Sequence, residues 1–168
     1  LGLTELIRAG HRRIALIATG GAIDDALGSS ASQVPSSTIL SHCRDRGAIM
    51  PDHALQFVDP LQPRAVIQVV RLLLAARPRP QALLLMDDHL VAPVAEALVG
   101  TGIVWASHAN RKDPQSAGLH LGFDAQQLVT SAVEVLLSVR RGAPPPALIR
   151  IPAVVLADRL VRRRIRAG

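Results

Sequence analysis

Two short runs of apolar residues most strongly constrain how this chain folds. Residues 14–18 read IALIA and residues 82–86 read ALLLM, and turn-forming or acidic residues directly follow each run. Short, uninterrupted apolar runs of this kind are typical of strands buried on both faces of a sheet. Because helix-length segments separate the runs, we predict an α/β fold: a mainly parallel sheet, joined by right-handed crossovers, with helices on both faces.

The same alternation continues along the rest of the chain, with glycines expected to end most of the helices. The polar segment 108–118 is expected to be a loop, and Asp124 is expected to cap the helix that follows it. Strands are predicted at 14–18, 55–58, 82–86, 103–107 and 148–151. Helices are predicted at 3–9, 38–46, 63–76, 89–99 and 124–140.

Polar residues follow the predicted strands at the edge where a ligand is expected. Parallel sheets of this kind bind ligands at the carboxyl ends of their strands, so the residues directly after each strand are the first candidates. Their side chains are small, acidic or amide, which suits hydrogen bonding to a polar neutral ligand such as a sugar or a nucleoside. The predicted ligand-binding residues are Gly20, Asp59, Asp87, Asp88, His108 and Asn110.

The motifs of phosphate, metal and nucleophile chemistry are incomplete in this sequence. The Thr-Gly-Gly after the first run lacks the remaining glycines of a phosphate-binding loop and indicates a tight turn. Asp87 and Asp88 are adjacent, so we interpret them as one helix cap and one site-facing group rather than a catalytic pair. The histidines are dispersed, and Cys43 lies inside a predicted helix. We therefore predict no catalytic residue, no metal and no cofactor, and a protein that is not an enzyme.

The positive charge of the chain is concentrated at one end. The 168 residues carry a formal net charge of +6, but the segment 159–168 holds five arginines and no acid. We interpret this Arg-rich tail as a solvated end rather than a DNA-binding surface. With aromatic residues at only 2% of the sequence, a protein that binds single strands by base stacking is also disfavoured.

Composition also bears on where the protein acts. A single cysteine excludes a disulfide framework, and no apolar run approaches the roughly 18 residues needed to cross a bilayer. The first residues, LGLTELIRAGHRR, lack the charged-then-apolar order of a signal peptide. We therefore expect a cytoplasmic protein without a membrane partner.

The order of these segments resembles the lactose/galactose repressor (LacI/GalR) family of transcriptional regulators. LIRAGHRRIALIATGG is similar to the opening of the C-terminal half of that family's sensor domain. PQALLLMDDHLVAPVAEALVGTGI resembles its strand, Asn-Asp pair, helix and glycine turn. The last part, from GFDAQQLVTSAVEVLLSVRRGAPPPALIRIP into IPAVVLADRL, resembles the family's closing helix, proline-rich turn, last strand and Leu-x-x-Arg ending.

This resemblance implies a periplasmic-binding-protein-like (type I) fold, in which two α/β lobes clasp a small effector. Residues 1–158 would form the C-terminal lobe, residues 159–168 the Arg-rich tail, and the DNA-binding head would be absent. Asp87 takes the place of the family's ligand-contacting Asn, Asp88 matches the Asp after it, and Asn110 falls near a ligand-binding Asp. The loop that begins at residue 107 is shorter than usual, as in regulators that join a GntR-type winged helix to a LacI-type sensor.

The leading hypothesis is therefore an effector-sensing domain of a bacterial DNA-binding transcriptional regulator. It would bind a small polar ligand and change the DNA affinity of a head that is not in this sequence. A lobe that normally shares a cleft with another would expose apolar surface, which favours a homodimer. The alternatives are a sugar-type solute-binding protein of a transporter and a small α/β enzyme using Asp87, Asp88 and His89.

Overall fold

A computed structural model describes residues 1–20, 36–108, 118–146 and 148–158. Two features of the sequence analysis lie outside these ranges: Asn110 with most of its predicted loop, and the Arg-rich tail. The strands are β1 Ile14–Thr19, β2 Leu55–Val58, β3 Ala82–Leu85, β4 Val104–His108, β5 Leu119–Phe123 and β6 Ala153–Asp158. The helices are α1 Gly2–Arg8, α3 Ser36–Asp45, α4 Pro63–Ala75, α5 Val91–Leu98 and α6 Ala125–Arg140, with short 3-10 turns η1 Asp52–Ala54 and η2 Asp88–Leu90.

All six strands form one sheet in the order β2-β1-β3-β4-β5-β6. The first five strands of that order pair in parallel, and β6 pairs with β5 in the antiparallel sense. The chain leaves β1 toward one side to form β2 and then passes to the other side of β1 to form β3. The predicted mainly parallel α/β sheet is confirmed, with one antiparallel strand at its edge.

The two apolar runs occupy the centre of the sheet, as predicted. All four residues of β3 are buried, and so are the first five residues of β1. The register places Leu16 beside Leu84, which in turn lies beside Ala106 of β4. Because both faces of these strands are covered, neither strand needs a polar face, and this explains their uninterrupted apolar sequence.

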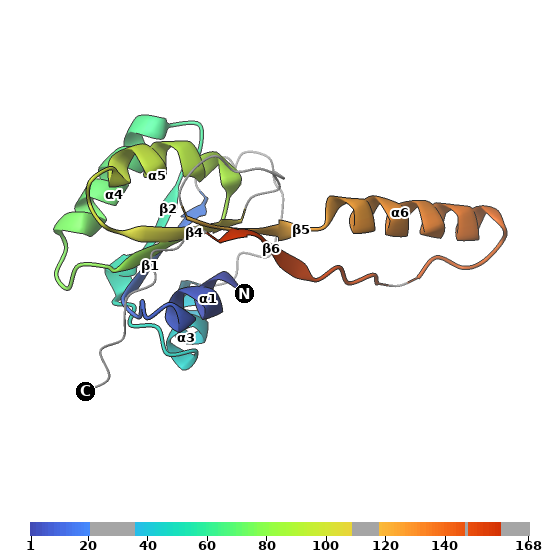
Figure 1. Cartoon of the computed structure of the whole chain (residues 1–168), viewed down its shortest axis with the longest axis horizontal. Coiled ribbons are helices and arrows are strands. Elements are labelled where there is room, and N and C mark those ends of the chain that lie inside the picture. The colour runs from blue at the N-terminus through green and yellow to red at the C-terminus, as the bar shows by residue number, and fades with distance from the viewer. Residues whose placement is uncertain (21–35, 109–117, 147, 159–168) are drawn as a thin grey trace.

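Helices cover both faces of this sheet (Figure 1), with α4 and α5 on one side and α1 and α3 on the other. Helix α4 buries Val66, Val70 and Leu73 at helical spacing. Helix α1 approaches the opposite face so closely that a Cβ atom at Gly2 would lie 2.6 Å from Leu121 Cδ1. Together, the sheet and these four helices form what we call the body, which comprises the described residues 1–20, 36–108, 118–123 and 153–158.

Helix α6 and the segment that returns from it lead away from the body (Figure 1). We call residues 124–152 the arm. Asp124 caps α6 as predicted, because its Oδ1 accepts hydrogen bonds from the backbone N–H groups of Gln126 and Gln127. None of the sixteen residues of α6 is buried. The arm therefore differs in its packing from every other helix-and-strand unit described in this chain.

Two predictions about strands were wrong. Strand β5 was not predicted, because its sequence, LHLGF, is short and contains a histidine and a glycine. The last strand was predicted at 148–151, but it is β6, five residues later. Three of the four residues at 148–151 are apolar, yet they lie on the arm, where none of the described strands pairs with them. Within the described ranges, no helix has the length and apolar character needed to cross a membrane.

Candidate functional site

The strand order creates a switch point at the carboxyl ends of β1 and β3. The chain connections leave these two strands in opposite directions, and in α/β sheets the carboxyl ends of the strands at such a point are where ligands commonly bind. Gly20 follows β1, and its backbone N–H donates to the Val58 carbonyl at 3.2 Å. On the other side of β1, the Met86 N–H donates to the Ile17 carbonyl at 3.0 Å, and Asp87 and Asp88 follow immediately. Three of the predicted ligand-binding residues therefore lie at this switch point.

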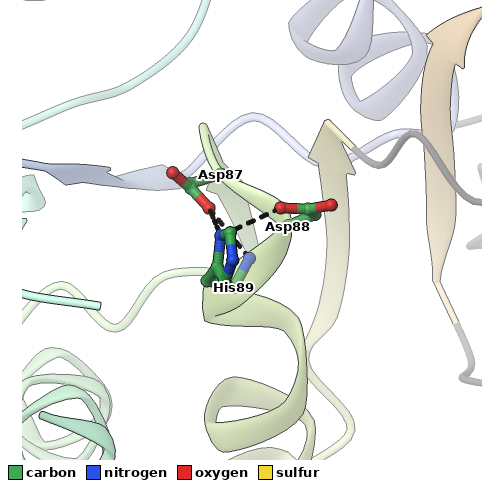
Figure 2. A group of neighbouring side chains, drawn as sticks. All are labelled: Asp87, Asp88 and His89. Atoms are coloured by element: carbon green, nitrogen blue, oxygen red, sulfur yellow. Dashed lines mark hydrogen bonds and ion pairs between the residues drawn. The ribbon is translucent and has the colours of Figure 1, made fainter. Parts of the chain in front are cut away.

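Asp87, His89 and Asp88 form a compact cluster where β3 passes into η2 (Figure 2). Asp87 Oδ1 accepts one hydrogen bond from the His89 backbone N–H at 2.8 Å and is 2.9 Å from the ring Nδ1. The same Nδ1 atom lies 3.1 Å from Asp88 Oδ1. The His89 ring thus bridges the two carboxylates, and Asp87 caps the turn as the sequence predicted. We call these three residues the Asp-Asp-His cluster.

The environment of Asp87 favours its ionised form. Partial burial acts to raise the pKa of this carboxyl, but the hydrogen bonds from the His89 backbone and ring outweigh it. The pKa of Asp87 is therefore lower than that of a free aspartate. The side chains of Asp87 and Asp88 are 28% and 35% exposed, so both carboxylates are accessible from solvent.

The cluster offers hydrogen-bond acceptors with negative charge, which suits hydroxyl or ammonium donors on a ligand. The opposite edge of the sheet carries positive charge: Arg12 and Arg13 precede β1, and the Arg13 Nε donates to the Arg79 carbonyl at 3.0 Å.

One ligand atom from each member of the Asp-Asp-His cluster lies within 4.8 Å of the others, so the three residues could also hold a cation. Carboxylates this exposed commonly lie together without one, and the absence of a metal stays a prediction.

The other predicted site residues occupy different positions. Asp59 accepts hydrogen bonds from the Leu61 N–H at 2.9 Å and from Gln62 Nε2 at 3.0 Å, so it closes a local turn. His108 ends β4 and makes an edge-to-face contact with Phe123, with ring centroids 5.6 Å apart. These contacts occupy both side chains with neighbours in the fold. The role of Asn110 lies outside the described residues.

A buried serine-histidine pair was not anticipated. Ser107 and His120 face each other across β4 and β5, with 3.3 Å between Ser107 Oγ and His120 Nδ1. Trp105 packs against the His120 ring edge-to-face at 5.0 Å. Because Ser107 and His120 are at most 1% exposed, a substrate would not reach the hydroxyl, and the pair links two strands. The histidine could have been assigned to the core only if β5 had been predicted first.

Neither a family model nor a curated protein sequence matches this chain. Solved structures do match it. A LacI family transcriptional regulator from Bifidobacterium animalis subsp. lactis superposes with a TM-score of 0.67 at 15% identity over 94% of this chain. One from Arthrobacter sp. FB24 in complex with lactose superposes with a TM-score of 0.64 at 19% identity over 90%. A third, from Clostridium acetobutylicum, has a TM-score of 0.60 at 13% identity over 89%.

These similarities establish the class of fold. The predicted resemblance to LacI-type sensor domains and to a periplasmic-binding-protein-like lobe is confirmed at the level of structure. This chain covers 59% of the length of each of the three regulators, so it corresponds to part of their structure. At identities below one fifth, the comparison speaks for the arrangement of strands and helices and leaves the ligand open.

Proposed function

We propose that the chain is one lobe of the effector-sensing domain of a bacterial transcriptional regulator. The observation that carries this proposal is the LacI-type fold over nearly the whole chain, with the Asp-Asp-His cluster at its switch point. In a two-lobed sensor, an effector that binds the closed and open states unequally shifts the equilibrium between them. DNA contact would come from a head outside this sequence, and the site of action would be the cytoplasm.

The effector that suits this lobe is a small polar molecule, sugar-like or nucleoside-like, that presents hydrogen-bond donors. Ionised Asp87 and the adjacent Asp88 would accept hydrogen bonds from hydroxyl or amino groups, while a phosphate or carboxylate on the effector would be repelled. Lactose in the Arthrobacter regulator is an example of a polyhydroxylated ligand on this fold. The protein would bind its effector without covalent chemistry, and therefore would not be an enzyme.

A ligand screen on the purified chain tests this function. Thermal-shift assays with monosaccharides, disaccharides including lactose, and nucleosides should reveal at least one stabilising ligand, and calorimetric titration then gives its affinity. Asp87→Asn and Asp88→Asn should each weaken binding by roughly 10- to 100-fold, because a charge-assisted hydrogen bond contributes about 1.5–3 kcal/mol.

Asp45→Asn is the matched control, because Asp45 is an exposed carboxylate at the end of α3, which leads to the amino edge of the sheet. The affinity of the Asp45→Asn variant for the identified ligand should equal that of the wild-type chain. Equal binding by all three variants would contradict the assignment of the site. A ligand that is turned over instead of retained would contradict the proposed class of function.

A further inference from the structure

Four arginines lie close together at the amino edge of the sheet, where strands β1 to β5 begin. Arg12 and Arg13 directly precede β1, and Arg77 and Arg79 lie between α4 and β3. Gln81 joins the two segments, because its Oε1 accepts hydrogen bonds from the backbone N–H groups of Arg12 and Arg13, both at 3.1 Å. We call these four arginines the arginine cluster.

The guanidinium groups of the arginine cluster interact with neutral groups. Arg13 Nε donates to the Arg79 carbonyl at 3.0 Å, and Arg77 Nη1 donates to two backbone carbonyls at the end of α4, each at 3.2 Å. Among the described residues, no carboxylate lies within ion-pair distance of any of the four. Arg12, Arg77 and Arg79 are also exposed. The positive charge of the cluster is therefore available to a partner.

The rest of the amino edge is less basic than the arginine cluster. Arg44 Nη2 lies 2.6 Å from Asp52 Oδ1, and Arg8 is paired with Glu5, so these two arginines are neutralised. The described acidic residues toward this edge are Glu5, Asp45, Asp52, Glu96 and Asp158. The unpaired positive charge is therefore confined to the two short segments 12–13 and 77–79.

A small apolar hollow adjoins the arginine cluster. Its volume is about 10 Å³, which admits one methyl-sized group. Pro78 and Pro80 flank Arg79, and because their rings fix the backbone, this segment loses little conformational freedom when a partner binds. The lining of the hollow includes Arg13, Ile49, Pro51, Leu73, Pro78 and Pro80.

This surface fits a short acidic protein segment that carries an aliphatic side chain. A carboxylate pairs with a guanidinium through two parallel hydrogen bonds, and arginine clusters are a recurrent means of recognising acidic motifs. The aliphatic side chain would place a methyl group in the hollow. Nucleic acid fits less well, because a DNA interface needs roughly 600 Å² or more of strongly basic surface, whereas acidic residues surround this cluster.

The arginine cluster lies at the opposite edge of the sheet from the arm. Helix α6 leaves the body after Phe123, at the carboxyl end of β5 (Figure 1), and the chain returns at Ala153, which pairs with Phe123. A lobe that covered the arm would therefore leave the amino edge exposed. We propose that the arginine cluster and its hollow dock an acidic segment of a partner protein, an interaction that goes beyond effector sensing.

Fluorescence anisotropy with a labelled peptide, one leucine flanked by glutamates on both sides, tests this docking. The full chain should bind the peptide, and the affinity should fall as the salt concentration rises from about 0.05 to 0.5 M. Combining Arg12→Glu with Arg77→Glu should weaken binding roughly tenfold or more, because attraction becomes repulsion. Arg64→Glu is the matched control, since Arg64 is exposed at the start of α4, on the carboxyl edge, and it should bind as the wild-type chain does.

A second peptide, with glycine in place of the leucine, tests the hollow. It should bind about threefold more weakly or worse, because one buried methyl group is lost. Absence of binding at millimolar peptide, equal affinity for the two peptides, or an equal loss in Arg64→Glu would overturn the proposal. So would tighter binding of a DNA duplex that the double variant abolishes, which would identify phosphates as the partner. Circular dichroism should show that all variants are folded. Effector binding at the Asp-Asp-His cluster should be unchanged in the double variant, so the two proposals fail independently.

Discussion

The body and the arm consist of comparably apolar sequence, but they differ in what surrounds it. In the body, the residues of β3 meet neighbouring strands at their sides and helices on both faces, and all of them are buried. In the arm, α6 is an amphipathic helix without one buried residue. The contrast teaches that an apolar pattern predicts which element forms, while burial depends on whether other segments of the same chain can cover it.

Leucine truncation should show this difference most strongly. Leu83 is 0% exposed in β3, so Leu83→Ala should lower the free energy of unfolding by roughly 2–5 kcal/mol. Leu136 is 69% exposed in the arm, so Leu136→Ala should lower this free energy by less than about 0.5 kcal/mol. Urea unfolding followed by the fluorescence of Trp105 measures both. Similar decreases in unfolding free energy for the two variants would mean that α6 packs on the body.

Two glycines with positive φ provide a second, smaller contrast. Gly118 in the body has φ +129°, and a Cβ atom there would lie 2.8 Å from the Trp105 indole. Gly142 in the arm has φ +87°, with nothing within 4 Å of the same position. Gly118→Ala should cost roughly 2–4 kcal/mol from strain and overlap, and Gly142→Ala about 1 kcal/mol from strain alone.

Urea unfolding of these two variants, with Trp105 fluorescence as the signal, separates the contributions. The emission spectrum of folded Gly118→Ala should also shift, because the indole must move. Equal costs at the two positions would indicate that Trp105 has free space beside it, contrary to the packing of the body.

The pH dependence of the free energy of unfolding should reveal a still smaller effect, which comes from Asp87 in the body. The pKa of Asp87 is lower in the folded chain than in the unfolded chain. Its stabilising contribution is therefore present above the unfolded pKa and is lost as the pH falls through the folded pKa. Asp87→Asn should be less stable than the wild-type chain near neutral pH, and the gap should narrow in acid. Unfolding curves across that range would contradict the pKa shift if the gap stayed constant.

The sequence predicted most elements of the body, because most of them have a local signal. Strand β2 was predicted with its observed bounds, and the cap at Asp124 was identified from residue type alone. Strand β5 lacked such a signal: its pairing with β4 and β6 depends on contacts between distant segments. The segment 148–151 shows the converse, since its leucine and isoleucines favour a strand but none of the described strands pairs with it.

The candidate site was predicted in part. Asp87 and Asp88 were predicted to follow β3, and they do, because the ALLLM run shows where this strand ends. The bridging by His89 could not be foreseen, because it depends on side-chain rotamers around η2. Asp59 also follows a strand, yet its carboxylate turns back to Leu61 and Gln62. Position after a strand therefore identified candidates, but it did not show which carboxylates have their hydrogen bonds satisfied within a local turn.

The antiparallel pairing of β6 with β5 has a consequence for the order of folding. Strand β6 ends the sheet and pairs with β5 alone, and the pairing closes the loop formed by the arm at an entropic cost of about 3 kcal/mol. Helices α4 and α5, which connect parallel strands, bury residues against the sheet and offset such a cost, whereas no residue of α6 is buried. We expect β6 to be the last strand to join the sheet and the first to open, and its amide hydrogens should exchange with solvent before those of β3.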